Sequence, residues 1–125
     1  MKLLDANVAI DALRGRPEAQ ILVGRALRDE EHLLGSEITR FEILAGVRRR
    51  EVEDTELFLL QLTWLPVDEV VARAAAAIAR EHRPANRGID DADCIVAATA
   101  LVYEAELLTT NVKHFPMLKG LEPAY

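Results

Sequence analysis

The segment Gly88–Ala100 constrains the fold of this 125-residue sequence more than any other stretch. It places Asp90, Asp91 and Asp93 directly before an apolar run that only Thr99 interrupts. A helix without a polar face lies inside a protein, so the first turn of such a helix opens where the core meets its edge. The pattern therefore predicts a buried helix whose amino end presents carboxylates to a pocket or a rim.

The three carboxylates are expected to have different environments in the folded chain. Asp90 has the character of a helix N-cap, where acids interact favourably with exposed N–H groups and the positive end of the helix. Asp91 is expected to face solvent. Asp93 has no Lys or Arg three or four positions away, where a helical partner would lie. Its charge must therefore be balanced by another part of the fold.

Composition narrows the class of protein. Half of the residues are hydrophobic and the mean hydropathy is near zero, which predicts a single globular domain over residues 1–125. The apolar runs are too short to cross a bilayer, and no signal-like segment opens the chain. The single cysteine, Cys94, excludes an internal disulfide and a cysteine-based zinc cage. A cytoplasmic protein without a membrane segment is expected.

The net charge of −6 argues against binding nucleic acid through bulk electrostatics, which needs a basic face. It does not argue against a nuclease. Carboxylates that hold divalent cations make the free chain more acidic than its working site, because each bound ion restores two charges.

Short apolar runs alternate with helical patterns along the chain. Strands are expected at Met1–Leu4, His32–Gly35, Trp64–Val67 and Ala105–Thr109, and Leu121-Glu122 can add an edge strand. Helices are expected over 8–13, 17–29, 36–47 and 54–62, then from a cap at Asp68 to about His82, and again from residue 90, with a short helical turn within 111–118. This alternation predicts a three-layer α/β/α fold with a mainly parallel four- or five-stranded central sheet. The reactive rim of such a sheet lies at the carboxyl ends of its strands, where Asp5 falls.

Two of the expected helices, over 36–47 and 54–62, are rich in Leu, Ile and Phe. Paired as a helical hairpin, they carry more apolar surface than one small core needs. A surface for a protein partner is therefore plausible there.

Three acids from distant parts of the sequence suggest a metal site. Asp5 ends a buried strand, Glu42 interrupts an apolar helix without a helical cation, and Asp93 opens the buried helix. Bringing such carboxylates together raises their pKa values unless a cation joins them. Oxygen ligands with open water positions favour Mg²⁺, with Mn²⁺ as a substitute, over zinc. An ion held in this way can activate water and neutralise a phosphodiester, which predicts metal-dependent hydrolysis.

Other polar residues can support this chemistry. Asn7 and Thr109 are candidates for hydrogen-bonding the carboxylates or a metal-bound water, although a helix cap and an ordinary strand residue explain them equally. The candidates for contacting phosphates are Arg14, Arg16, Arg83, Arg87 and Lys113, each also explained as a surface charge. His114 falls close to the rim, but a lone histidine is more often structural. No glycine-rich phosphate loop or nucleophile elbow is present, which argues against a nucleoside triphosphatase or a serine hydrolase.

Four segments in order carry a family resemblance: residues 4–8 (LDANV), 39–46 (TRFEILAG), 93–100 (DCIVAATA) and 108–115 (LTTNVKHF). Together they resemble the PIN-domain ribonucleases and, among them, the VapC-type toxins of toxin–antitoxin pairs. The resemblance spans essentially the whole chain.

The resemblance implies Asp5, Glu42 and Asp93 as metal-site acids and Asp90 as an auxiliary. It also implies Mg²⁺-dependent endonucleolytic cleavage of RNA that leaves a 5′-phosphate and a 3′-hydroxyl. Members are usually homodimers held in check by a VapB-type antitoxin whose tail crosses the active-site groove. Their substrates are typically structured RNAs such as tRNA or ribosomal RNA.

One departure from the family pattern concerns the metal count. Many members carry a further acid where this chain has Asn111 or His114. Asn111 can still ligate through its amide oxygen or hold a metal-bound water, so a second ion is expected to bind weakly. Two other interpretations stay open at this stage. One is a non-catalytic helical interaction domain in which the acids are caps, and the other is a metal-dependent phosphohydrolase of small phosphoesters.

Overall fold

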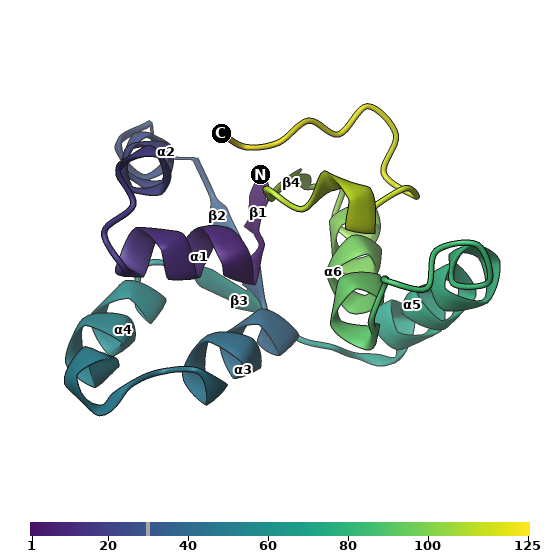
Figure 1. Ribbon diagram of the computed structural model, residues 1–125, viewed down its shortest axis with the longest axis horizontal. Helices are drawn as coiled ribbons and strands as arrows, with labels where there is room; N and C mark the ends of the chain where they lie inside the picture. Colours follow the sequence, from purple (N-terminus) through teal and green to yellow (C-terminus); the bar gives the residue numbers. More distant parts are fainter. Residues whose placement is uncertain (30) are drawn as a thin grey trace.

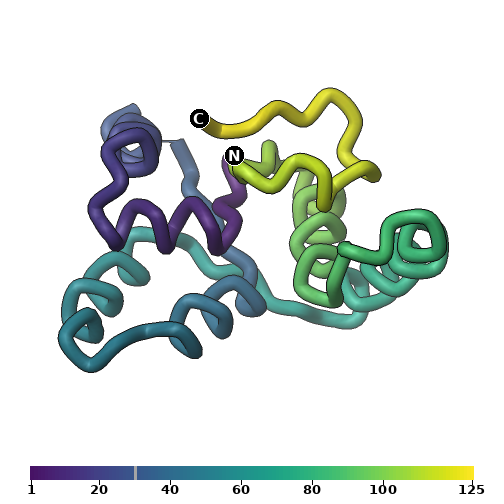
Figure 2. Tube along the Cα trace, in the orientation of Figure 1, coloured from purple at the N-terminus to yellow at the C-terminus, as the bar shows by residue number. Residues whose placement is uncertain are grey.

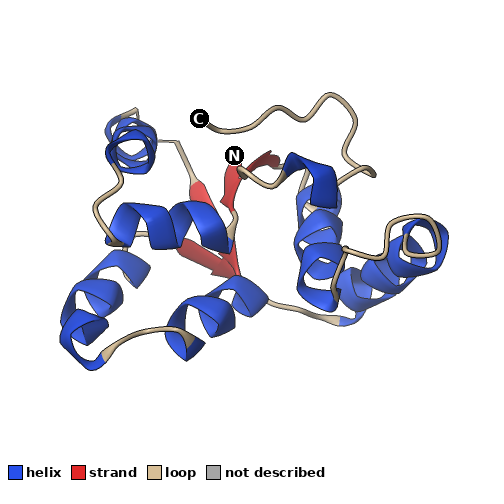
Figure 3. Ribbon diagram, viewed as in Figure 1, coloured by secondary structure: helices blue, strands red, loops and turns tan. Residues whose placement is uncertain are grey.

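The computed structural model describes residues 1–29 and 31–125, and it places a four-stranded sheet between two groups of helices (Figures 1 and 3). The strands are β1 (Lys2–Leu4), β2 (Leu33–Ser36), β3 (Thr63–Leu65) and β4 (Glu106–Leu108). The α-helices are α1 (Ala6–Leu13), α2 (Pro17–Arg28), α3 (Glu37–Ala45), α4 (Val52–Leu59), α5 (Glu69–His82) and α6 (Asp91–Val102). Two 3₁₀ turns, η1 (Arg49–Glu51) and η2 (Val112–His114), precede α4 and follow β4.

The sheet is parallel throughout, in the order β3-β2-β1-β4. In the register, Leu3 of β1 lies between Leu34 of β2 and Leu107 of β4. The predicted fold class is confirmed with four strands, and the additional edge strand predicted at Leu121-Glu122 is wrong. That segment makes no ladder with β4, and Pro123 beside it has no N–H to donate to one.

The sheet separates two cores because successive strand residues point to opposite faces. One face, including Leu3 and Leu107, packs against α5 and α6. The other face, including Leu4 and Leu108, packs against α1 and α2. Figure 3 shows this division, with the strands in red between the two sets of helices. The three predicted layers are therefore present, and each strand delivers its carboxyl end to the same rim.

The buried helix predicted after Asp90 is confirmed as α6. Its residues from Val96 to Ala100 are at most 3% exposed, and the helix lies between the sheet and α5. None of the helices in the described part of the chain combines the length and the apolar character needed to cross a bilayer.

Several predicted boundaries shift for local reasons. The first helix begins at Ala6 rather than at residue 8, because Asp5 caps it. The strand predicted at Trp64–Val67 ends at Leu65 instead, because Pro66 follows and cannot donate to a ladder. Asp68 caps α5 as predicted, and its side chain accepts the Val71 N–H at 3.0 Å.

Candidate metal centre at the carboxyl ends of the strands

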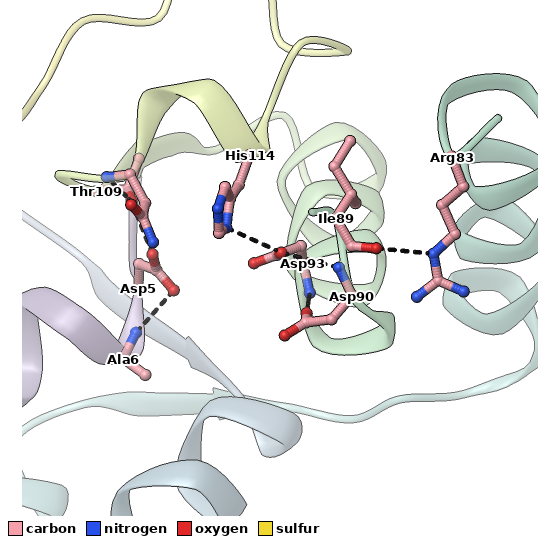
Figure 4. A network of polar contacts seen from close by, with 9 residues as sticks. Asp5, Ala6, Arg83, Ile89, Asp90, Asp93, Thr109 and His114 are labelled. Atoms are coloured by element: carbon pink, nitrogen blue, oxygen red, sulfur yellow. Dashed lines mark hydrogen bonds and ion pairs between the residues drawn. The ribbon is translucent and has the colours of Figure 1, made fainter. Parts of the chain in front are cut away.

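Asp5 stands at the junction of β1 and α1, and hydrogen bonds hold both of its carboxylate oxygens (Figure 4). Oδ1 accepts the Ala6 N–H at 2.9 Å, and Oδ2 accepts the Thr109 hydroxyl at 2.7 Å. The side chain is buried, with 7% of the residue exposed. The strand end and the helix start therefore fix the direction of this carboxylate.

Thr109 directly follows β4 and is fully buried. Its hydroxyl takes part in two hydrogen bonds. Its hydroxyl oxygen accepts the Asn111 N–H at 3.0 Å, so its proton is directed to Asp5. Asn111 contributes here through its backbone, and its half-buried side chain caps nothing at the start of η2. Asn7 lies exposed in the first turn of α1, and its side chain makes no hydrogen bond among the described residues.

Asp90 and Asp93 form a reciprocal capping box at the start of α6. The Asp93 N–H donates to Asp90 Oδ1 at 2.8 Å, and the Asp90 N–H donates to Asp93 Oδ2 at 3.1 Å. The predicted cap at Asp90 is confirmed. Asp91 is exposed, as predicted, and pairs with Arg83 at 2.7 Å.

His114 is the residue near the acids that the sequence interpretation undervalued. Its Nδ1 lies 3.2 Å from Asp93 Oδ2, and in Figure 4 the imidazole lies between Asp93 and the Asp5–Thr109 pair. The sequence feature that could have indicated this contact is the position of His114, five residues after Thr109 in the segment that follows β4. His114 thus supplies part of the balance that Asp93 lacked along its own helix.

Glu42 is half-buried on α3 and is close enough to the other acids to titrate with them. Burial, followed by the charges of Asp5, Asp90 and Asp93, raises the pKa of Glu42 to about 6. These acids come from three separate parts of the chain. Glu42 therefore lies within electrostatic reach of carboxylates that are far away in the sequence.

The pKa values of Asp93 and Asp5 are raised, like that of Glu42. Burial raises the pKa of Asp93 to about 6; the Asp90 N–H and His114 oppose that rise and the Asp90 charge adds to it. Burial also raises the pKa of Asp5, although the hydrogen bonds from Thr109 and Ala6 act against it. The rim thus holds carboxylates that favour either a proton or a cation beside them.

The donor set suits a hard divalent cation, because every candidate ligand is a carboxylate oxygen. Across residues 1–29 and 31–125, however, no three His, Cys, Asp or Glu side chains already stand close enough to share one ion. Repulsion between like charges keeps the carboxylates apart, and hydrogen bonds occupy Asp5 and Asp93. Each bonded oxygen keeps a second lone pair with which it can ligate a cation.

The basic residues divide into two groups. Arg83 and Arg87 line one surface hollow, Lys113 and His114 line the next, and Ile89 borders both. This group therefore adjoins the acidic rim. The Arg83 guanidinium also donates to the Ile89 carbonyl at 3.0 Å, which fixes the loop before α6.

The structure does not bring Arg14 and Arg16 to the rim. They follow the carboxyl end of α1, about 12 Å along the helix from its Asp5 cap. Arg14 lies 3.8 Å from Glu51, and Arg16 pairs with Glu18 at 2.9 Å and with Asp11 at 3.6 Å. Local acids therefore satisfy both side chains at a distance from the carboxylates.

Comparison with known proteins identifies the family and the fold of the chain. Residues 2–119 match the family model described as PIN domain. The chain is 47% identical to Ribonuclease VapC19 of Mycobacterium tuberculosis over 125 residues, which is the full length of both. It is 34% identical to Ribonuclease VapC10 of the same species, covering 100% of this chain and 93% of that one. A toxin–antitoxin complex from Klebsiella pneumoniae superposes with a TM-score of 0.82 at 27% identity, covering 100% of this chain and 98% of that chain.

Proposed function

Because the chain belongs to the PIN-domain family, we propose that its rim of carboxylates cuts RNA. It is an endoribonuclease of the VapC type, the toxin of a toxin–antitoxin pair. Asp5, Glu42 and Asp93 are proposed to hold Mg²⁺, with Mn²⁺ as a substitute and Asp90 as an auxiliary acid. The observation that carries this assignment is that carboxylates from three parts of the chain lie within electrostatic reach, since Asp5, Asp90 and Asp93 all raise the pKa of Glu42.

A divalent ion at this rim supplies a Lewis acid and a water molecule with a lowered pKa. The residues of the chain prepare the site for it. Thr109 and the Ala6 N–H orient Asp5, while the Asp90 N–H and His114 orient Asp93 through its Oδ2. Glu42 is contributed by α3, which packs directly against α6. Such hydrogen bonds orient ligating side chains and raise their affinity for a cation.

RNA is the proposed substrate because cationic hollows lead to the acidic rim. Arg80, Arg83 and Arg87 line the first hollow, and Lys113 lines the second beside His114. Both hollows are open to the surface, which suits a polymer better than a small phosphoester. Cations in this arrangement bind phosphates without reading bases. A structured RNA such as tRNA or ribosomal RNA is proposed on the family resemblance.

A VapB-type antitoxin is the proposed protein partner. Solved neighbours include toxin–antitoxin complexes, and α3 and α4 expose large apolar side chains that a partner would cover. Phe41 and Leu57 are 64% and 58% exposed. A homodimer is proposed on the family resemblance. A cytoplasmic location is proposed because Cys94 is free and buried, as a reducing compartment allows.

Sequencing of cleaved RNA ends after brief induction tests the function. The wild-type chain should produce new ends with 5′-phosphates, and Asp93→Asn should produce none. Asp54→Asn is the matched control, because it removes an acid from the first turn of α4, away from the rim. Purified protein should lose cleavage in EDTA and regain it with Mg²⁺. Cleavage that persists in Asp93→Asn or in excess EDTA would show that the acids serve only as helix caps.

A further inference from the structure

Tyr125 connects the segment after η2 to helix α1 through its side chain. Its hydroxyl donates to Asp11 Oδ2 on α1, and the Arg16 guanidinium covers its ring at 5.0 Å from the centroid. Arg16 also pairs with Asp11 at 3.6 Å. One side chain is thus held by a carboxylate, a cation and the apolar core beneath α1.

The neighbouring residue anchors the same segment at a second point. The Ala124 N–H donates to the Thr109 carbonyl at 2.8 Å. Figure 2 shows this segment in yellow crossing from the η2 side of the molecule back toward α1 and α2. Residues 124 and 125 therefore attach both to Thr109 and to α1.

The residue and the helix to which this segment attaches, Thr109 and α1, also supply the two hydrogen bonds that support Asp5. Thr109 donates to Asp5 Oδ2, and the first residue of α1 donates to Asp5 Oδ1. If α1 shifted relative to the end of β4, one of these hydrogen bonds would have to lengthen. Hydrogen bonds weaken steeply outside a narrow range of distance and angle. A brace between α1 and Thr109 therefore controls the direction of the Asp5 carboxylate.

We infer that Tyr125 is a positioning residue for Asp5, and that it holds the carboxylate ready for a divalent cation by fastening α1 to Thr109. This inference rests on the proposed metal role of Asp5. The hydroxyl is the decisive group, because removing it leaves the ring packed on the core beneath α1. Burial and the bond to Asp11 raise the pKa of Tyr125, so the hydroxyl keeps its proton for donation at neutral pH.

The test is a Mn²⁺ titration of the full chain in the absence of RNA. Tyr125→Phe should weaken Mn²⁺ binding by up to about tenfold, the lower end of the loss caused by removing an outer hydrogen-bonding partner. Asp11→Ala should weaken binding at least as much, because it also removes the pair with Arg16. The double variant should be no worse than Asp11→Ala alone, because both changes break the hydrogen bond between Tyr125 and Asp11. Asp11→Asn keeps an acceptor oxygen and should retain most of the affinity.

Tyr103→Phe is the matched control. Tyr103 is half-buried at the end of α6, packs on the other core, and its hydroxyl makes no hydrogen bond among the described residues. A metal-free readout accompanies the titration: the Ala6 amide proton should exchange faster in Tyr125→Phe and at the wild-type rate in Tyr103→Phe.

The outcomes separate this inference from the proposed function. A wild-type chain that binds no Mn²⁺, or binds it equally well after Asp5→Asn, overturns both. Wild-type binding that depends on Asp5 but is unchanged in Tyr125→Phe overturns the positioning role alone. Equal weakening in Tyr125→Phe and Tyr103→Phe also overturns it, because a general loss of stability would then explain the result.

Discussion

The imidazole Nδ1 of His114 lies 3.2 Å from Oδ2 of Asp93. The same oxygen accepts the Asp90 N–H, so η2 and the start of α6 meet at one carboxylate. Many members of the family that this chain resembles carry an acid at or near this position. In this chain an imidazole takes that place, and its protonated form opposes the rise in the pKa values of Asp5 and Asp93. His114 of η2 can therefore offset negative charge where an acid would add to it.

His114→Asp should make the metal-free protein less stable and its metal response larger. The new carboxylate adds repulsion at the rim and also adds a ligand for a second ion. We expect a lower melting temperature in EDTA and a larger rise on adding Mn²⁺, measured by thermal melts. His32→Asp is the control, because it adds the same charge at an exposed position before β2. An identical metal response in the two variants would contradict the prediction.

The raised pKa of Glu42 predicts how stability depends on pH. Its pKa rises from 4.5 to about 6 on folding, so the folded state binds a proton more tightly than the unfolded state. This contribution is fully present below about pH 4.5 and is lost as pH rises through about 6. Glu42→Gln should therefore be nearly as stable as the wild type at pH 4.5 and more stable at pH 7.5.

The measurement is the difference in melting temperature between Glu42→Gln and the wild type, taken in EDTA at each pH. Taking the difference removes the titration of groups that both proteins share. Glu53→Gln, an exposed acid in the first turn of α4, should show no such growth with pH. Saturating Mg²⁺ should reverse the advantage of Glu42→Gln at pH 7.5. A difference that shrinks as pH rises would show that burial of Glu42 is not costly.

Thr39→Val should stabilise the protein by about 1 kcal/mol, because a buried polar group without a partner costs free energy. The Thr39 hydroxyl is buried on α3 and has no hydrogen-bond partner among the described residues. Valine has nearly the same shape. Thr99→Val is the control, since the Thr99 hydroxyl donates to the Ile95 carbonyl at 2.7 Å. Denaturant unfolding should show a gain for Thr39→Val and none for Thr99→Val; the reverse order would contradict the argument.

Gly35→Ala should destabilise the protein by about 1–3 kcal/mol through overpacking. A Cβ at Gly35 would clash with the Trp64 ring, meeting Cζ3 first and lying 2.7 Å from Cε3. The indole has little freedom to move, because its N–H donates to the Leu59 carbonyl at 2.8 Å and Arg40 covers the ring.

Two further variants check this steric cause. Adding Trp64→Leu to Gly35→Ala should cost less than the sum of the two single changes, because the clash is then absent. Gly24→Ala should be neutral or stabilising, since Gly24 is helical and its Cβ would meet the nearest atom at an ordinary 3.5 Å. Additive losses in the double variant would exclude the clash.

Local patterns in the sequence were enough for much of the fold. Alternating apolar runs and helical stretches predicted the strand and helix order, and Asp68 and Asp90 were recognisable as caps because capping depends on neighbours within three residues. The extra strand at Leu121-Glu122 was predicted wrongly. Two residues carry little periodicity, and it is Ala124 and Tyr125, just after this segment, that bond to Thr109 and α1.

By itself, the sequence determined the three-layer architecture, the burial of α6 and the location of Asp5 after a strand, because these follow from hydrophobic period and chain order. Only the tertiary structure decided which side chains meet. Packing of helices on both faces brings Glu42, Asp90 and Asp93 within electrostatic reach of one another, seats His114 against Asp93 and leaves Arg14 and Arg16 at the far end of α1. The physical reason is that these contacts join residues far apart in the chain, whose distances depend on how the sheet and helices pack and not on any local preference.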